Sequence, residues 1–161
     1  MCSEFPYEFI IQGESMKFNP GEHLEEFNRL YREMDRIYHE LAVNAGMSDS
    51  AFFILYAIVE MGNGYLQKDI AERYSISRQT VNSSVQNLKA KGYVEMEPGN
   101  GRDRHIYLTP AGQQVAERNI YPVMKMEKDA FQEMSEQESR ELLKLTRKYV
   151  RIFQDKTEHM R

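Results

Sequence analysis

Apolar residues between Gly21 and Asn44 recur at steps of three and four residues, which is the period of an amphipathic helix. The Ala45-Gly46 sequence is a suitable end for that helix. After a cap-forming Ser-Asp-Ser sequence, an unbroken apolar run over 51–59 predicts a buried helix at 49–61. The run is shorter than the ~18 residues that a membrane-spanning helix needs.

Two shorter helices are predicted over 66–74 and 78–91, separated by a tight turn. Gly92 ends the second of them. After Gly92 the apolar period falls to two, which predicts a β-hairpin with strands near 93–96 and 105–108.

The chain after the hairpin is predicted to be helical. A helix starts at Thr109-Pro110 and runs to about Met134 with a kink near Pro122, and Ser135 forms a capping box with Glu138 for a last helix. The apolar residues of the last helix follow a heptad-like spacing, at Leu142, Leu145, Tyr149, Ile152 and Phe153.

Residues 1–20 have no helical period. The alternation of Phe5, Tyr7, Phe9 and Ile11 predicts a short strand, or an arm that docks on a partner. The order of elements as a whole predicts a mostly α-helical, α+β protein with one small β-hairpin.

Composition narrows the class of protein. A chain of 161 residues that is 41% hydrophobic can bury one compact core. The single cysteine, Cys2, excludes a disulfide framework and any multi-cysteine zinc site. Because the chain shows neither a long apolar run nor the pattern of a signal peptide, we expect a soluble cytoplasmic protein without membrane association.

The net charge of -4 hides an asymmetry along the chain. Residues 1–65 carry 11 acidic and 4 basic side chains, whereas residues 66–112 carry 7 basic and 5 acidic ones. Screening limits each charge to its neighbourhood, so only the middle block offers a basic surface to an anionic partner.

The middle block has the pattern of a helix-turn-helix. Small Ala71 lets the first helix pack closely on the second, and Ile76 in the turn and the stripe Val81, Val85 and Leu88 hold the pair together, with Ser77 as N-cap. The other face of the second helix carries no acid; its residues are Arg78, Gln79, Asn82, Ser83, Gln86, Lys89 and Lys91.

That polar face suits the major groove of DNA. Arg, Gln and Asn match the donors and acceptors of base edges, and we expect Arg78, Gln79, Asn82, Ser83 and Gln86 to read bases. Hydroxyls and lysines suit the backbone, and Thr80, Ser83, Ser84, Lys68, Lys89 and Lys91 are the candidates for it. The alternative is a solvent-facing polar surface on an ordinary helix.

The hairpin adds two arginines at a Gly-rich tip. Arg102 and Arg104 are suited to a narrow minor groove, where negative potential is focused. The alternative is a solvated tip in which Asp103 forms a salt bridge with an arginine.

The block from Leu66 to Val94, followed by Tyr107-Leu108-Thr109-Pro110-Ala111-Gly112, resembles the MarR (multiple-antibiotic-resistance regulator) family of winged helix-turn-helix transcription factors. The resemblance covers about residues 22–158 and is specific only in the middle block. The family's wing has an Asp two residues before its key Arg; here Asn100 stands at the Asp position and Arg102 at the Arg position.

The resemblance implies a homodimer with one recognition helix and one wing in each subunit. It divides the chain into a mobile arm (1–20), a dimerisation helix (21–46), a winged helix-turn-helix domain (47–112) and C-terminal dimerisation helices (113–161). The two apolar stripes at the chain's ends also favour a dimer, because one small winged domain cannot cover both. Two recognition helices ~34 Å apart would then read a pseudo-palindrome on double-stranded DNA.

The resemblance further implies a small-molecule effector rather than a bound cofactor. Aromatic residues on helices that would line the family's effector cleft suggest a small aromatic or amphipathic ligand; they are Tyr31, Tyr38, Phe52, Phe53 and Tyr56. Each of them is equally consistent with a place in the core.

No catalytic or metal site is expected. The chain lacks nucleophile-elbow, phosphate-loop and H-E-x-x-H motifs, so an enzyme is not indicated. Some family members bind zinc, for which His39 beside Glu40 would be the candidate, but the four histidines are scattered. Cys2 has no neighbouring base that would lower its pKa, which argues against redox sensing.

The preferred interpretation is a sequence-specific, double-stranded-DNA-binding transcriptional regulator, in particular a ligand-responsive repressor. The alternative is a winged-helix module that binds protein and not DNA, which the acidic net charge favours.

Overall fold

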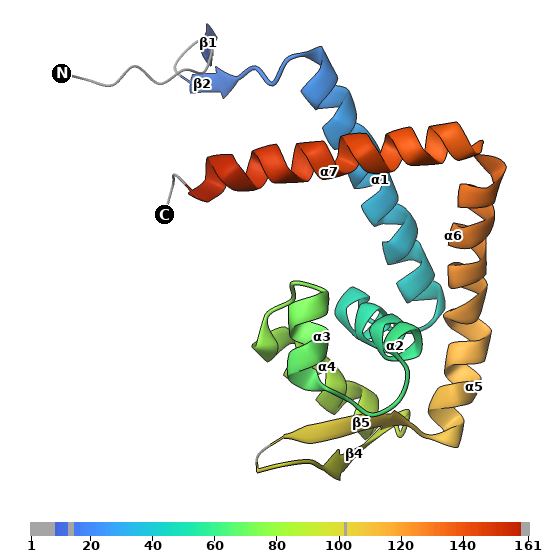
Figure 1. Ribbon diagram of the computed structural model, residues 1–161. Helices are drawn as coiled ribbons and strands as arrows, with labels where there is room; N and C mark the ends of the chain where they lie inside the picture. Colours follow the sequence, from blue (N-terminus) through green and yellow to red (C-terminus); the bar gives the residue numbers. More distant parts are fainter. Residues whose placement is uncertain (1–8, 13–14, 102, 159–161) are drawn as a thin grey trace. The chain divides into compact units, whose positions relative to one another are not determined.

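The computed structural model describes residues 9–12, 15–101 and 103–158. It consists of two compact units, residues 1–52 and residues 53–161. Helices predominate, with a small three-stranded sheet, as the sequence predicts (Figure 1). Cys2 and the aromatic side chains of Phe5 and Tyr7 lie outside the described residues.

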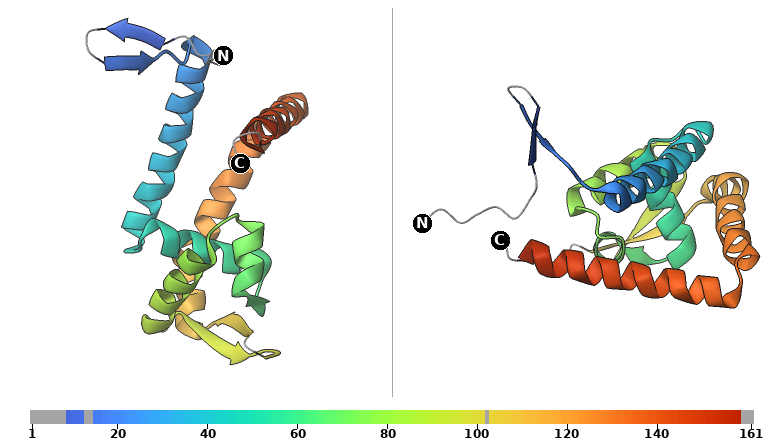
Figure 2. Two further views of the ribbon diagram at one scale, coloured as in Figure 1. Left: turned by 90° about the vertical axis from the view of Figure 1, so that its left-hand side faces the viewer. Right: turned by 90° about the horizontal axis from the view of Figure 1, so that it is seen from above.

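The first unit begins with a two-stranded antiparallel hairpin, visible in both views of Figure 2. Strand β1 (Phe9–Gln12) pairs with β2 (Ser15–Phe18), with Phe9 opposite Phe18. The alternation of aromatic residues predicted a strand here. It did not predict β2, since Ser15–Phe18 is too short to show a period.

Helix α1 (Glu22–Asn44) is amphipathic and largely exposed. The Asn19 side chain accepts a hydrogen bond from the Gly21 backbone at 3.0 Å, and Gly21 turns the chain with φ +74°. Only Ala42 of α1 is buried, while Tyr31 remains 55% exposed.

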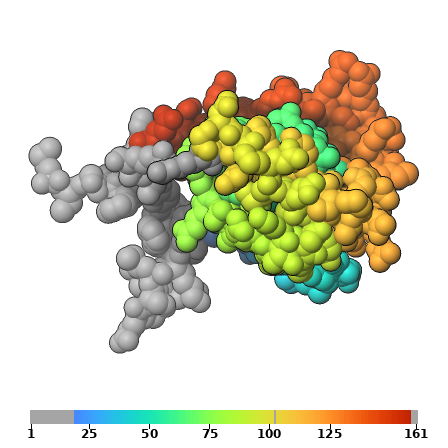
Figure 3. Space-filling model, turned by 90° about the horizontal axis from the view of Figure 1, so that it is seen from below, coloured from blue at the N-terminus to red at the C-terminus, as the bar shows by residue number. Residues whose placement is uncertain are grey.

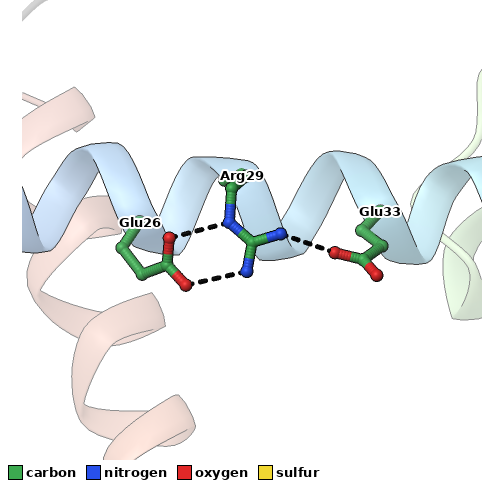
Figure 4. A network of polar contacts seen from close by, with 3 residues as sticks. All are labelled: Glu26, Arg29 and Glu33. Carbon is green, nitrogen blue, oxygen red and sulfur yellow. Dashed lines mark hydrogen bonds and ion pairs between the residues drawn. The ribbon is translucent and has the colours of Figure 1, made fainter.

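The polar face of α1 contains ion pairs between residues of the same helix (Figure 4). The Arg29 guanidinium donates to both carboxylate oxygens of Glu26 and to Glu33, each at 2.8 Å. These hydrogen bonds from Arg29 hold the pKa of Glu26 below its usual value. Arg36 similarly pairs with Glu40 at 3.8 Å.

Helix α2 (Asp49–Met61) starts in the first unit and forms the buried centre of the second. Its apolar run is inaccessible at Phe52, Ile54 and Leu55. Among the described residues no single helix is long and apolar enough to cross a membrane; only α1 and α2 taken together, as a bent pair, reach that length and apolarity.

The second unit contains the predicted helix-turn-helix and hairpin. It comprises β3 (Tyr65–Leu66), α3 (Gln67–Arg73), α4 (Arg78–Ala90), β4 (Val94–Pro98) and β5 (Arg104–Leu108). The three strands form an antiparallel sheet in the order β3-β5-β4, with Tyr65 opposite Ile106. Strand β3 was not predicted, because two residues carry no periodic signal and Leu66 was assigned to the following helix.

Three helices complete the unit: α5 (Pro110–Asn119), α6 (Tyr121–Glu133) and α7 (Glu136–Glu158). The predicted kink near Pro122 is a break at Ile120, since a proline nitrogen has no proton to donate to the preceding turn. Ser135 and Glu138 form the predicted capping box, with the Ser135 backbone N–H donating to Glu138 Oε2 at 2.8 Å. Hydrogen bonds from Ser135 hold the pKa of Glu138 below its usual value.

The start of α5 is fixed against the end of the α4–β4 turn. Thr109 caps α5 by accepting from Gly112 N at 3.0 Å, and its hydroxyl donates to Gly92 O at 2.6 Å. A Cβ atom at Gly112 would lie 1.8 Å from Tyr93 O, so only glycine permits this approach.

Gly112→Ala should therefore destabilise the fold. We expect the free energy of unfolding in urea to fall by about 1–3 kcal/mol, the usual cost of overpacking. The control is Ala111→Ser at the exposed neighbouring position. Equal stability of the two variants would contradict the close packing of α5 on Tyr93.

Candidate nucleic-acid interface

Helix α4 is held by one buried stripe and presents the opposite face to solvent. Ser77 caps the helix by accepting from Thr80 N at 3.1 Å. Val81, Val85 and Leu88 are fully inaccessible, as predicted. Ser84 is also buried at 4% exposure, so its predicted role in backbone contacts to DNA is wrong. Positions 81, 84, 85 and 88 are a complete i, i+3, i+4, i+7 stripe.

The exposed face of α4 contains the predicted base-reading residues. The side chains there are those of Arg78, Gln79, Asn82, Ser83, Gln86 and Lys89, and Lys91 follows as the exposed C-cap. Thr80 is half-buried. The face includes no acidic residue of α4 itself.

Two hydroxyls of α4 are engaged in local hydrogen bonds. Thr80 Oγ1 lies 2.8 Å from Ser77 Oγ, and the Ser83 hydroxyl donates to the Thr80 carbonyl at 3.0 Å. Because the Ser83 hydroxyl proton is donated to Thr80 O, only the acceptor lone pairs of Ser83 remain for a partner. A phosphate oxygen is itself an acceptor and cannot form a hydrogen bond with them. In this conformation Ser83 suits a base amino group better than a phosphate.

A surface groove of about 530 Å³ lies between α3, α4 and the β4–β5 wing. Figure 3 shows α3, α4 and the wing side by side on this face. Six of the predicted DNA-contacting residues line the groove together, namely Lys68, Arg78, Asn82, Gln86, Lys89 and Arg104. Leu66, Gln67, Met96 and Asp103 also line it and were not predicted.

Arg102, the predicted tip residue of the wing, lies outside the described residues. The turn around it is closed by a hydrogen bond from Gly99 N to Asp103 O at 2.9 Å and another from Asp103 N to Asn100 O at 3.1 Å. Arg104 opens β5 with an exposed side chain.

The wing is tied to α3 by an ion pair. Lys68 Nζ lies 2.9 Å from Asp103 Oδ2, across 35 positions of sequence. The hydrogen bond to Asp103 raises the pKa of Lys68, which keeps the ammonium charged. Sequence reasoning had considered an arginine as the partner of Asp103; the structure shows Lys68, because folding brings α3 beside the wing.

A second carboxylate lies beside Arg78, which lines the groove. Glu72 of α3 lies 3.7 Å from the Arg78 guanidinium, and both side chains are well exposed. The absence of acids on α4 therefore does not extend to its neighbours. Glu72 and Asp103 place counter-charges beside two of the cations that would meet phosphates.

The base of the wing is anchored to the α2–α3 connection. His105 Nδ1 donates to the Gly64 carbonyl at 2.6 Å, which places a proton on that nitrogen. The Leu108 backbone N–H donates to Asn63 Oδ1 at 2.9 Å. Gly64 adopts φ +89°, which a side chain would disfavour.

Helix α3 is also joined to α2 through one carboxylate. Glu60 accepts from the Tyr74 hydroxyl and lies 3.5 Å from Arg73 Nε. Burial and the hydrogen bond to Glu60 raise the pKa of Tyr74. These contacts and the wing's anchors join α2, α3 and the wing.

The predicted effector residues are divided between the two units. Tyr31, Tyr38 and Phe52 belong to the first unit and Phe53 and Tyr56 to the second. Phe52 is fully buried and serves the core. Tyr38, Phe53 and Tyr56 are half-buried. The Tyr56 hydroxyl donates to Glu127 Oε2 at 2.6 Å and joins α2 to α6.

His39 contacts a carboxylate at the corner between α1 and α2. Its Nδ1 lies 2.9 Å and 3.1 Å from the two oxygens of Asp49. Over the ranges that the structure describes, no three His, Cys, Asp or Glu side chains gather as metal ligands would.

Comparison with known proteins identifies the fold. The sequence model described as the MarR family matches residues 45–103. A MarR family regulator from Neisseria meningitidis aligns at a TM-score of 0.73 and 17% identity, covering 88% of this chain and 100% of that chain. No curated protein sequence matches the chain.

Two further solved structures carry ligands in their descriptions. The MepR–DNA complex of Staphylococcus aureus aligns at a TM-score of 0.66 and 20% identity, over 83% of this chain and 98% of that chain. The PcaV regulator of Streptomyces coelicolor, in complex with its natural ligand, aligns at a TM-score of 0.59 and 20% identity, over 76% and 90%. Residues 45–103 therefore match the MarR family, and the chain has the winged helix-turn-helix fold of the MarR family regulators to which it is similar.

Proposed function

We propose that the chain is a sequence-specific, double-stranded-DNA-binding transcriptional regulator that acts as a homodimer on a pseudo-palindromic operator. The observation that carries the proposal is the groove in which cations and amides from α3, α4 and β5 converge. The recognition helix would enter the major groove, where Arg78, Asn82 and Gln86 offer forked donors and acceptors to base edges. The MepR–DNA complex, with the same fold, supports this role.

The backbone contacts would come from the ends of the interface. Lys68, Lys89 and Lys91 would contact phosphates, and Arg102 and Arg104 of the wing would enter the minor groove. Because Lys68 is paired with Asp103, it would approach a phosphate while keeping that partner, since an ammonium has three donors.

The exposed apolar stripes of α1 and α7 would form the dimer. They contain Leu30, Met34, Ile37, Leu145, Ile152 and Phe153, each at least 41% exposed. We assign residues 21–46 and 113–161 to dimerisation and residues 47–112 to DNA binding. A small aromatic or amphipathic effector would release the repressor from DNA, as the ligand-bound PcaV structure suggests.

A protein-interaction module without DNA binding is the second candidate. The net charge of -4 and the carboxylates of Glu72 and Asp103 at the groove favour it. Selection of bound sequences from a random DNA pool with the purified full chain separates the two. Enrichment of a pseudo-palindrome supports the regulator, and failure to enrich any sequence favours the protein-binding module.

The wing contacts should appear in the salt dependence of binding. Arg102→Ala and Arg104→Ala should each weaken operator binding and flatten the plot of log affinity against log salt by about one unit, because one phosphate neutralisation is lost. Fluorescence anisotropy at several salt concentrations measures the slope. Arg118→Ala on α5 is the control. A wing variant with the same affinity and salt slope as this control would show that the wing arginine does not contact DNA.

A further inference from the structure

The polar face of α7 carries a run of cations that the proposed function leaves unused. Lys144, Arg147, Lys148 and Arg151 recur at i, i+3, i+4 and i+7, which places them in one stripe of the helix surface. No acidic residue occurs from 142 to 154. The four side chains line a shallow surface hollow of about 420 Å³. We call these four residues the α7 stripe.

The α7 stripe lies on the side of the helix away from the heptad-like apolar residues, with Leu143 and Val150 at its edge. Leu142, Leu145, Tyr149 and Phe153 follow the heptad-like spacing, and Tyr149 stacks on Phe153 with ring centroids 6.1 Å apart. At 3.6 residues per turn, the centres of the two stripes are about half a turn of the helix apart. A dimer that buries the apolar stripe therefore leaves the α7 stripe open.

The charges of the α7 stripe are not balanced within the helix. Of its cations, Lys144 lies 3.1 Å from Glu141. Across the described residues, no carboxylate lies within ion-pair distance of Arg147, Lys148 or Arg151. On α1, by contrast, Arg29 and Arg36 are each paired with glutamates of their own helix.

The α7 stripe is also distant from the groove at α4. The chain leaves the wing at β5 and reaches α7 only after α5 and α6, and α7 lies at the far end of those helices from the wing (Figures 1 and 2). A straight duplex seated on α4 would therefore not reach the stripe. An anion bound at the stripe would therefore belong to a second molecule or a distant segment.

We propose that the α7 stripe binds the phosphate backbone of a second DNA duplex, so that the regulator bridges two duplexes. The stripe spans about 10 Å of helix, along which a duplex presents roughly one charge per 1.7 Å, enough to face every cation. A duplex presents these charges already ordered, whereas an acidic peptide would lose conformational freedom on binding. The inference rests on the proposed function, which supplies the first duplex.

The test is capture of a second duplex by protein held on the first. Full-length protein is loaded on bead-bound operator from the selection experiment, and a fluorescent random-sequence duplex is added at about 50 mM salt. We expect wild-type protein to retain the fluorescent duplex, with an affinity that falls as salt rises. Arg147→Glu with Arg151→Glu should reduce capture at least tenfold while operator loading stays within about twofold.

The matched control is Arg118→Glu with Lys128→Glu, which makes the same charge change on α5 and α6. It should capture as wild-type does. Failure of wild-type protein to load on the operator would refute the proposed function and not the bridging. Normal loading without capture, or equal capture by the stripe variant, would overturn the bridging. Retention of labelled polyglutamate in place of the duplex, lost in the stripe variant, would assign the α7 stripe to an acidic protein segment instead.

Discussion

Replacement of Asn82 and Gln86 by alanine should abolish sequence recognition while sparing non-specific binding. Both side chains are exposed on α4 and line the groove. A bidentate base contact is worth about 1–3 kcal/mol of discrimination, so the loss of two contacts should weaken binding to the selected operator by about 2–6 kcal/mol, which is roughly 30- to 20,000-fold. Affinity for a random duplex at low salt should change by less than about twofold, since the lysines and arginines remain.

The control for this variant is Asn87→Ala. Asn87 is exposed on the same helix but does not line the groove. Fluorescence anisotropy with operator and random duplexes gives both affinities, and thermal unfolding confirms that each variant is folded. A parallel loss of both affinities would mean that Asn82 and Gln86 contact the DNA phosphate backbone. No loss of operator affinity would mean that these two residues do not contact bases.

Helix positions in this protein follow from local signals, and these are what the sequence predicted well. Residues close together in the sequence determine the buried stripe of α4, the N-cap at Ser77 and the capping box of Ser135 with Glu138. The period of i, i+3 and i+4 also includes Ser84. Its burial could have been predicted from position alone, had the hydroxyl not suggested a surface role.

The features that sequence reasoning missed are non-local. Strand β3 exists because Tyr65 pairs with Ile106, 41 residues away, and two residues cannot show a period. The pair of Lys68 with Asp103 and the pair of Arg78 with Glu72 arise only when α3, α4 and the wing are brought together. Charge counting along the chain identified a basic block but could not show that three of its cations, Lys68, Arg73 and Arg78, have carboxylate neighbours.

These pairs bear on how the interface would work. Both are exposed, so each contributes little to stability. Their effect is on charge density, since each carboxylate reduces the local positive potential beside α4 and lowers affinity for any duplex. In the proposed regulator, weak non-specific binding would leave discrimination to the groove contacts and to the spacing of two half-sites, and the dimer would then be essential.

Charge substitutions in the apolar stripe of α7 should split the dimer. Leu145 and Phe153 are 52% and 58% exposed in the single chain, and a dimer interface would bury them. Leu145→Glu with Phe153→Glu places two carboxylates in that interface, where each would lose its hydration without a partner. Light scattering should give twice the 19.0 kDa of one chain for the wild type and one chain mass for the variant.

The same variant should lose operator affinity without any change at the groove. Two linked recognition helices gain about 10²- to 10⁴-fold from effective concentration, and a monomer forfeits that gain. Arg151→Glu is the control, because it adds negative charge on the face of α7 away from Leu145 and Phe153 and should stay dimeric. A wild-type protein that scatters as a monomer, or a double variant that remains a dimer and binds operator normally, would show that residues 113–161 do not form the dimer. If the variant is monomeric and still binds a half-site weakly, DNA recognition resides in residues 47–112 and the dimer supplies the remainder of the affinity.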